Sequence, residues 1–148
     1  DWIIESFRLA RSAFSDTTVL LINEYSIMNS ITNTDRYLEI IRLLQAEDLI
    51  DAIGFQAHGF SHNVSNEIYM RNLDTLASTG LPLYATELDI DGPTDLEHVH
   101  NYMNLFPLLW EHPAIKGITL WGFKPGMWRG DEGCYLIDEE GTDIAECC

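Results

Sequence analysis

Positive charge is scarce in this chain. Its 148 residues include 8 Lys and Arg against 24 Asp and Glu, which gives a formal net charge of −16 at pH 7. Nucleic-acid binding depends on Lys and Arg that neutralise phosphates, so the composition excludes nucleic acid as a partner. Hydrophobic residues make up 46% of the chain, which is typical of a globular domain and not of a disordered segment.

Long apolar runs and an initiating methionine are also absent. No run reaches the roughly 18 apolar residues of a membrane span, so we predict no membrane segment. The first residue is Asp1, and the sequence opens inside a helical pattern. We therefore expect the chain to be part of a longer polypeptide.

Cysteine is limited to Cys134, Cys147 and Cys148, and their spacing does not match paired zinc ligands. Cys134 could form a disulfide with either of the other two, which would imply an oxidising compartment. The sequence leaves the disulfide state open.

Helical and strand-like patterns alternate along the chain. The apolar spacing predicts helices at residues 1–14, 33–48, 65–78 and 94–112, and strands at residues 18–22, 51–56, 81–88 and 117–123. We expect Thr34 or Asp35 to cap the second helix and Pro107 to interrupt the fourth. Strands that alternate with helices predict an α/β fold with parallel strands and right-handed crossovers.

Two α/β architectures fit this alternation. A doubly wound sheet favours a Gly-rich phosphate turn after the first strand, and residues 23–31, NEYSIMNSI, contain no such turn. All four predicted strands end in polar or aromatic residues, as the strands of a (β/α)8 TIM barrel do at their catalytic ends. A complete barrel needs about 250 residues, so this chain would supply roughly half of one.

Carboxylates at the strand ends are the candidates for chemistry. Glu87 closes the third predicted strand, and glycosidases use two carboxyl groups that flank the scissile bond. Asp89 shares a face with Glu87 on an extended chain, and His58 could orient a neighbouring carboxylate. Glu24 ends the first strand and is a possible partner for Glu87. His62 follows His58 by four residues, but no third ligand is evident, so we predict no metal site.

An aromatic, Gly-rich segment follows the last predicted strand and contains Trp121, Phe123, Trp128 and Tyr135. Loops run over the surface, where such side chains are poor core candidates and their flat faces suit sugar rings. The alternative is that the rings pack together as a small satellite cluster.

Together, the motifs GFQAH (residues 54–58) and TELD (residues 86–89) resemble family 10 of the glycoside hydrolases, the endo-1,4-β-xylanases. The similarity runs along nearly the whole chain, and the four predicted strands resemble strands five to eight of that barrel. The resemblance implies that residues 1–148 are the C-terminal half of a single barrel domain. The N-terminal half and the last helix are then expected to be missing.

The resemblance also implies roles for individual residues. Glu87 corresponds to the nucleophile, and His58 and Asp89 correspond to residues that hold it. The positions expected to bind substrate are Gln56, Trp121, Trp128, Asn23 and Arg129. The acid/base of this family is a Glu of the fourth strand, which would lie upstream of Asp1, so Glu24 is not expected to serve in that role.

The family resemblance further implies a retaining hydrolase of xylan or xylo-oligosaccharides that needs no cofactor and is secreted. The fragment alone would be inactive and would need the missing half of the barrel as its partner. Three alternatives remain: another retaining β-glycanase on the same barrel, a non-catalytic carbohydrate-binding remnant, and a structural α/β domain.

Overall fold

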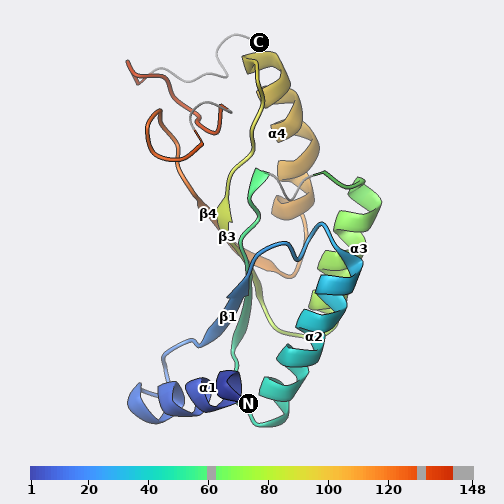
Figure 1. The fold of residues 1–148 in the computed structure, drawn as a ribbon, viewed down its shortest axis with the longest axis vertical. Coiled ribbons are helices and arrows are strands. Elements are labelled where there is room, and N and C mark those ends of the chain that lie inside the picture. Colours follow the sequence, from blue (N-terminus) through green and yellow to red (C-terminus); the bar gives the residue numbers. More distant parts are fainter. Residues whose placement is uncertain (60–62, 130–132, 142–148) are drawn as a thin grey trace.

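The computed structural model describes residues 1–59, 63–129 and 133–141, and it has eight helices and strands in strict alternation (Figure 1). In chain order these are α1 (Trp2–Ala13), β1 (Leu21–Glu24), α2 (Ile31–Ala46), β2 (Ala52–Phe55), α3 (Asn66–Ala77), β3 (Leu83–Leu88), α4 (Asp95–Trp110) and β4 (Ile115–Leu120).

The four strands form one parallel sheet in the order β1-β2-β3-β4. Each strand therefore pairs with the next one along the chain, and no strand is inserted between earlier ones. A doubly wound sheet reverses its strand order at a switch point, and this sheet does not. The arrangement is that of consecutive strands in a (β/α)8 barrel, and it confirms the predicted fold class.

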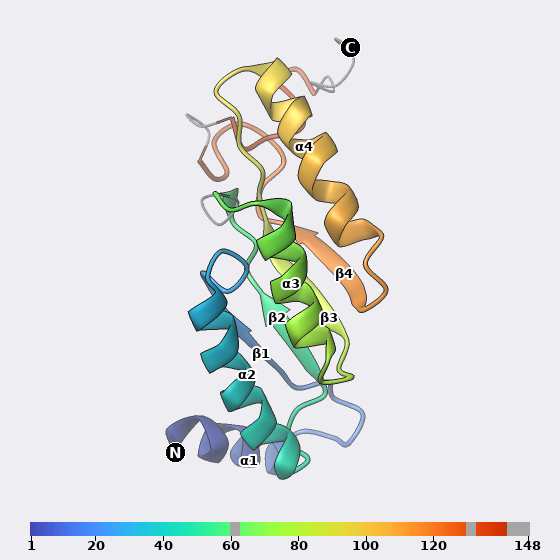
Figure 2. The ribbon, with the colours of Figure 1, turned by 90° about the vertical axis from the view of Figure 1, so that its right-hand side faces the viewer.

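Helices α2, α3 and α4 lie together on one side of the sheet (Figures 1 and 2). Their apolar residues recur every three or four positions and pack on the strand residues that point the same way. The core of this layer comprises Tyr37, Ile41, Leu44, Ile53, Phe55, Tyr69, Leu73, Leu76, Leu83, Ala85, Leu105 and Leu109. This packing fixes the sheet and hence the positions of the residues at its ends.

The other side of the sheet, here called the inner face, is the side that faces the interior of a closed barrel. Leu21, Asn23 and Thr86 point to this face, since a Cβ built on Gly54 would meet all three side chains. Leu21 is 40% exposed and Leu120 at the other edge is 38% exposed. Apolar residues on the inner face and at the edges of the sheet are thus exposed to solvent in the described part of the chain.

Several predicted boundaries and the predicted cap of α2 are wrong. The first strand begins at Leu21, three residues later than predicted, and α2 begins at Ile31 with Ser30 as its N-cap. Thr34 is buried inside that helix, where its hydroxyl donates to the Ile27 carbonyl. Because Ser30 satisfies the Asn33 N–H, no cap is needed at Thr34 or Asp35.

Pro107 does not interrupt α4, which continues through it to Trp110. A proline inside a helix removes the N–H that would bond the carbonyl four residues earlier, here that of Met103. Met103 is 71% exposed, so water can bond that carbonyl instead. None of the helices in the described ranges has the length and apolar character to cross a membrane.

Candidate active site

Three side chains meet at the carboxyl ends of β2 and β3. His58 Nε2 lies 3.0 Å from Glu87 Oε2, and His58 Nδ1 lies 3.1 Å from Asp89 Oδ2. The side chains of His58 and Asp89 are 7% and 1% exposed, whereas that of Glu87 is 17% exposed. Glu87 is therefore the member of the group that a ligand could reach from solvent.

Asp89 is held by two N–H donors and by the His58 ring. Its Oδ2 accepts from the indole Nε1 of Trp128 and lies against His58 Nδ1, and its Oδ1 accepts from the backbone N–H of Gly59. A carboxylate offers acceptor oxygens only, which suits these N–H donors. Asp89 thus fixes the position of the His58 ring, and His58 in turn fixes Glu87.

A β-bulge in β3 brings Glu87 to the inner face. The pairing of β3 with β4 shifts register between Ala85 and Leu88, and bulges of this kind re-aim side chains. As a result Thr86 and Glu87 both contact Asn23 of β1, which donates from Nδ2 to Glu87 Oε1 at 3.2 Å. The sequence predicts Asn23 as a substrate-binding residue, and the structure places it directly on Glu87.

Glu24 points to the opposite side of the sheet from Asn23. It borders a hollow of about 240 Å³ beside α2, together with Arg36 and Tyr37. Burial raises the pKa of the Tyr37 phenol, and the negative charge of Glu24 raises it further. Glu24 is therefore close to the helix layer and does not face Glu87 across the inner face.

The aromatic residues after β4 border the His58–Glu87 pair. The ring of Trp128 lies 5.4 Å from that of His58, and the ring of Trp121 lies 6.0 Å from it in an edge-on arrangement. Trp121, Phe123 and Trp128 are 43%, 45% and 38% exposed. Trp121 and Trp128 form a half-exposed rim at the site, and the Trp128 side chain is bonded into it through Asp89.

Gln56 and Arg129, the other two residues predicted to bind substrate, contact the loops and strands around the site. The Arg129 guanidinium forms an ion pair with Asp91 at 2.6 Å. The backbone of Gln56 links the strands, because its N–H donates to the Glu24 carbonyl and its carbonyl accepts from the Glu87 N–H. Gln56 thus fixes the main chain at Glu87, whereas Arg129 fixes the loop after β4 to the loop after β3.

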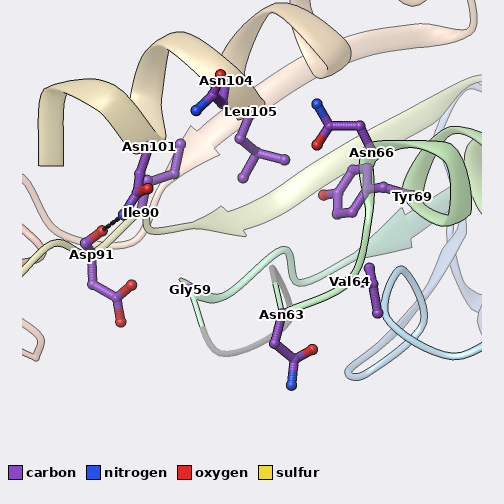
Figure 3. Close-up of a pocket in the computed structure, with 10 residues that line it drawn as sticks. All are labelled: Gly59, Asn63, Val64, Asn66, Tyr69, Ile90, Asp91, Asn101, Asn104 and Leu105. Atoms are coloured by element: carbon purple, nitrogen blue, oxygen red, sulfur yellow. Dashed lines mark hydrogen bonds between the residues drawn. The ribbon is translucent and has the colours of Figure 1, made fainter. Parts of the chain in front are cut away.

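A cavity of about 570 Å³ lies next to this site, between the loops after β2 and β3 and helices α3 and α4 (Figure 3). It is lined by Gly59, Asn63, Val64, Asn66, Tyr69, Ile90, Asp91, Asn101, Asn104 and Leu105. Asn101 closes one wall by donating to the Asp91 carbonyl at 2.8 Å. Glu87 does not line this cavity. The sequence gives no sign of it, because its amides come from separate segments.

The remaining predictions concern metals and cysteines. No three His, Cys, Asp or Glu residues converge as metal ligands within residues 1–59, 63–129 and 133–141. His62, Cys147 and Cys148 lie outside these ranges. Cys134 is buried and free within the described residues, and burial raises its pKa to about 12, with further increases from Asp89 and Asp91. Its pairing with Cys147 or Cys148 stays a prediction.

Comparison with known proteins places this chain in a family. The model of Glycosyl hydrolase family 10 matches residues 1–144. Endo-1,4-beta-xylanase B of Cellvibrio japonicus is 33% identical over 144 residues, which cover 96% of this chain and 23% of that protein. The chain belongs to glycosyl hydrolase family 10.

Two other similar proteins extend the comparison. Xylanase 10B from Thermotoga petrophila, solved in complex with xylobiose, superimposes with a TM-score of 0.80 at 26% identity, over 96% of this chain and 47% of that one. The anti-sigma-I factor RsgI6 of Acetivibrio thermocellus is 28% identical over 120 residues, which cover 78% of this chain and 16% of that protein. The chain therefore spans between about a sixth and a half of the proteins it resembles here.

Proposed function

We propose that residues 1–148 are the C-terminal half of a retaining endo-1,4-β-xylanase, with Glu87 as its nucleophile. The observation that carries this proposal is the contact of Glu87 with His58 and Asn23 at the open ends of the strands. Glu87 is the partly exposed carboxylate of that group, whereas Asp89 is enclosed by its donors. Family membership supports the same assignment.

The proposed reaction has two steps. The Glu87 carboxylate attacks the anomeric carbon of a xylosyl unit, and the bond from that carbon to the leaving oxygen breaks as an upstream Glu protonates that oxygen. The same upstream Glu then removes a proton from water, which attacks the anomeric carbon and releases Glu87. Retaining enzymes place these two carboxyl groups about 5 to 5.5 Å apart. The second one must come from the other half of the barrel, because Glu24 faces α2.

His58, Asn23 and Asp89 have positioning roles in this proposal. His58 and Asn23 bond different oxygens of Glu87, so the carboxylate plane is fixed before substrate arrives. Trp121 and Trp128 form an exposed aromatic rim that suits the apolar face of a pyranose ring. We assign xylan or xylo-oligosaccharides as the substrate, with Gln56 and Arg129 nearby at the same ends of the strands. No step requires a cofactor.

The decisive experiment uses the complete polypeptide to which residues 1–148 belong. Incubation with a 2-deoxy-2-fluoroxylobiosyl fluoride should trap a glycosyl-enzyme, and peptide mass spectrometry should locate the added mass on Glu87. Glu87→Gln keeps the side-chain shape but should abolish both labelling and xylan hydrolysis. Label on another residue, or hydrolysis by Glu87→Gln at wild-type rate, would reject the assignment.

A companion experiment tests the half-barrel proposal. Purified residues 1–148 should show no turnover of xylan, because one carboxyl group of the pair is absent. Addition of the segment that precedes Asp1 should restore hydrolysis. That segment should contain an Asn-Glu pair at a strand end about 40 residues before Asp1, by the repeat length of the barrel. Turnover by residues 1–148 alone would show that the second carboxylate lies within them.

A second candidate function is a non-catalytic carbohydrate-binding module. The observation that favours it is the similarity to a protein named as an anti-sigma factor. In that case the complete polypeptide would bind xylo-oligosaccharides in a calorimetric titration without forming products. A panel of xylan, β-glucan and cellulose would in turn separate a xylanase from another β-glycanase. We also expect an extracellular location, which fractionation of the producing cells would test.

A further inference from the structure

We propose that Thr86 is a positioning residue for Glu87. Its hydroxyl holds the side-chain amide of Asn23 so that the amide N–H points at the Glu87 carboxylate. This inference rests on the proposed role of Glu87 as nucleophile, and it assigns a function to the residue that precedes it in the chain.

The contacts form a short relay on the inner face. Thr86 Oγ donates to Asn23 Oδ1 at 2.8 Å, and Asn23 Nδ2 donates to Glu87 Oε1 at 3.2 Å. The bulge between Ala85 and Leu88 makes the relay possible, because in a regular strand Thr86 and Glu87 would point to opposite faces. Two adjacent residues of β3 therefore reach the same side chain of β1.

The chemistry of the three groups determines how the amide is turned. An ionised Glu87 only accepts hydrogen bonds, so Asn23 must present its NH2 group and not its oxygen. The amide oxygen then needs a donor, and the Thr86 hydroxyl supplies one. The same hydroxyl lies 3.2 Å from the Phe55 carbonyl, which is a second possible acceptor, and the shorter distance is the one to Asn23 Oδ1. With the proton donated to Asn23, the amide is bonded at both its oxygen and its NH2 group.

Gly54 leaves the space that this relay occupies. A Cβ at that position would lie 2.9 Å from Asn23 Oδ1 and 3.1 Å from Thr86 Cγ2, which is too close for either side chain to stay in place. The relay therefore depends on three strands: Thr86 of β3 donates, Asn23 of β1 carries the amide, and Gly54 of β2 leaves room for both side chains.

The charged groups around Glu87 are few. His58 approaches it from the loop after β2, with Asp89 behind the imidazole, and Glu24 of β1 faces α2. Asn23 of β1 donates to Glu87 Oε1, whereas His58 lies against Oε2, so the two carboxylate oxygens are held from different strands. A misplaced Asn23 amide should therefore leave one oxygen of Glu87 free to move.

The test compares Thr86→Val with Thr86→Ser in the complete polypeptide. Val has the shape of Thr without the hydroxyl, whereas Ser restores the hydroxyl. The substrate is 2,4-dinitrophenyl β-xylobioside, whose leaving group needs little protonation, so kcat/KM reports attack by Glu87. Thr86→Val should lower kcat/KM by roughly threefold to tenfold, the range for one hydrogen bond between neutral groups, and Thr86→Ser should restore it.

A double-mutant cycle, together with rescue by Thr86→Ser, separates positioning from a structural role. In an Asn23→Ala background, Thr86→Val should cause no further loss, since the relay is already broken. Thr86→Ala provides a second hydroxyl-free variant if Thr86→Val does not fold.

Two results would overturn the inference. One is a Thr86→Val variant with wild-type kcat/KM. The other is an equal loss from Thr86→Val with and without Asn23, which would indicate a structural effect only. If the wild-type protein neither cleaves the aryl xylobioside nor forms a glycosyl-enzyme, the proposed function itself fails, and that outcome is distinct from both.

Discussion

The imidazole of His58 lies between two carboxylates, with Nε2 3.0 Å from Glu87 and Nδ1 3.1 Å from Asp89. A neutral imidazole has one N–H and can donate to one of them, whereas an imidazolium donates to both. The group is therefore a coupled unit in which a change at Asp89 reaches Glu87 through the ring.

Asp89→Asn should lower kcat/KM on xylan by roughly tenfold to a hundredfold, because a hydrogen bond to a charged group contributes about 1.5–3 kcal/mol. The amide would place its NH2 group against the N–H donor of Trp128 or Gly59, and the His58 ring would lose its fixed position. Initial rates with xylan measure the effect. Asp95→Asn, at an exposed carboxylate of α4, is the matched control and should match wild type. Wild-type rates for Asp89→Asn would contradict the coupling.

Glu24→Gln should retain xylan hydrolysis within about twofold of wild type, the usual scale of surface substitutions away from a site. Glu24 borders the hollow beside α2, and its Oε1 accepts from the Tyr25 N–H at 2.8 Å. The measurement is kcat with unactivated xylan, for which an acid catalyst matters most. A loss of a thousandfold or more would mean that Glu24 is the acid after all.

The fold was predictable because each strand and helix carries a local pattern. The apolar spacing of Tyr37, Ile41 and Leu44 predicts a helix face, and the run at residues 83–88 predicts a strand. Helix ends depend on single contacts that periodicity does not contain, such as the cap at Ser30. The tolerance of Pro107 depends on which side of α4 faces solvent, which is a property of the packed structure.

Only part of the candidate site could be predicted from the sequence. Strand-end positions and the family resemblance single out Glu87, His58 and Asp89, and the structure brings these three together. The contact of Asn23 with Glu87 depends on the bulge in β3, which turns Glu87 to the inner face. A register shift of this kind cannot be seen in the alternation of apolar and polar residues along a strand, so the sequence does not predict this contact. Thr86 was missed for the same reason, because alternation places it on the opposite face from Glu87.

Cys134 should react slowly with thiol reagents in the native protein. Burial raises its pKa to about 12, so at pH 8 its thiolate fraction is about a thousandfold below that of a thiol with the ordinary value of 9.0. The measurement is the rate of iodoacetamide alkylation in a Cys147→Ser/Cys148→Ser variant, with the unfolded protein as control. Rapid alkylation of the folded protein would contradict the buried placement, and a disulfide in wild type would appear as one remaining thiol.

Gly54→Ala should impair both stability and activity, whereas Gly80→Ala should affect stability alone. The added Cβ at Gly54 would lie 2.6 Å from Leu21 Cδ1 and 2.9 Å from Asn23 Oδ1, and such overpacking costs about 1–3 kcal/mol. Gly80 lies in the turn just after α3, with φ +79°, and no atom lies within 4 Å of a Cβ at that position. Its substitution therefore adds backbone strain of about 1–2 kcal/mol without a clash.

Chemical denaturation of the complete polypeptide gives the two stability changes, and kcat/KM with an aryl xylobioside gives the activities. Because the Gly54 substitution displaces the Asn23 amide that bonds Glu87, its activity should fall by more than tenfold at a temperature where both variants remain folded. Gly80→Ala matches it in chemical change and serves as the control for stability. Equal activities in the two variants would show that the space above Gly54 serves packing and not the orientation of Glu87.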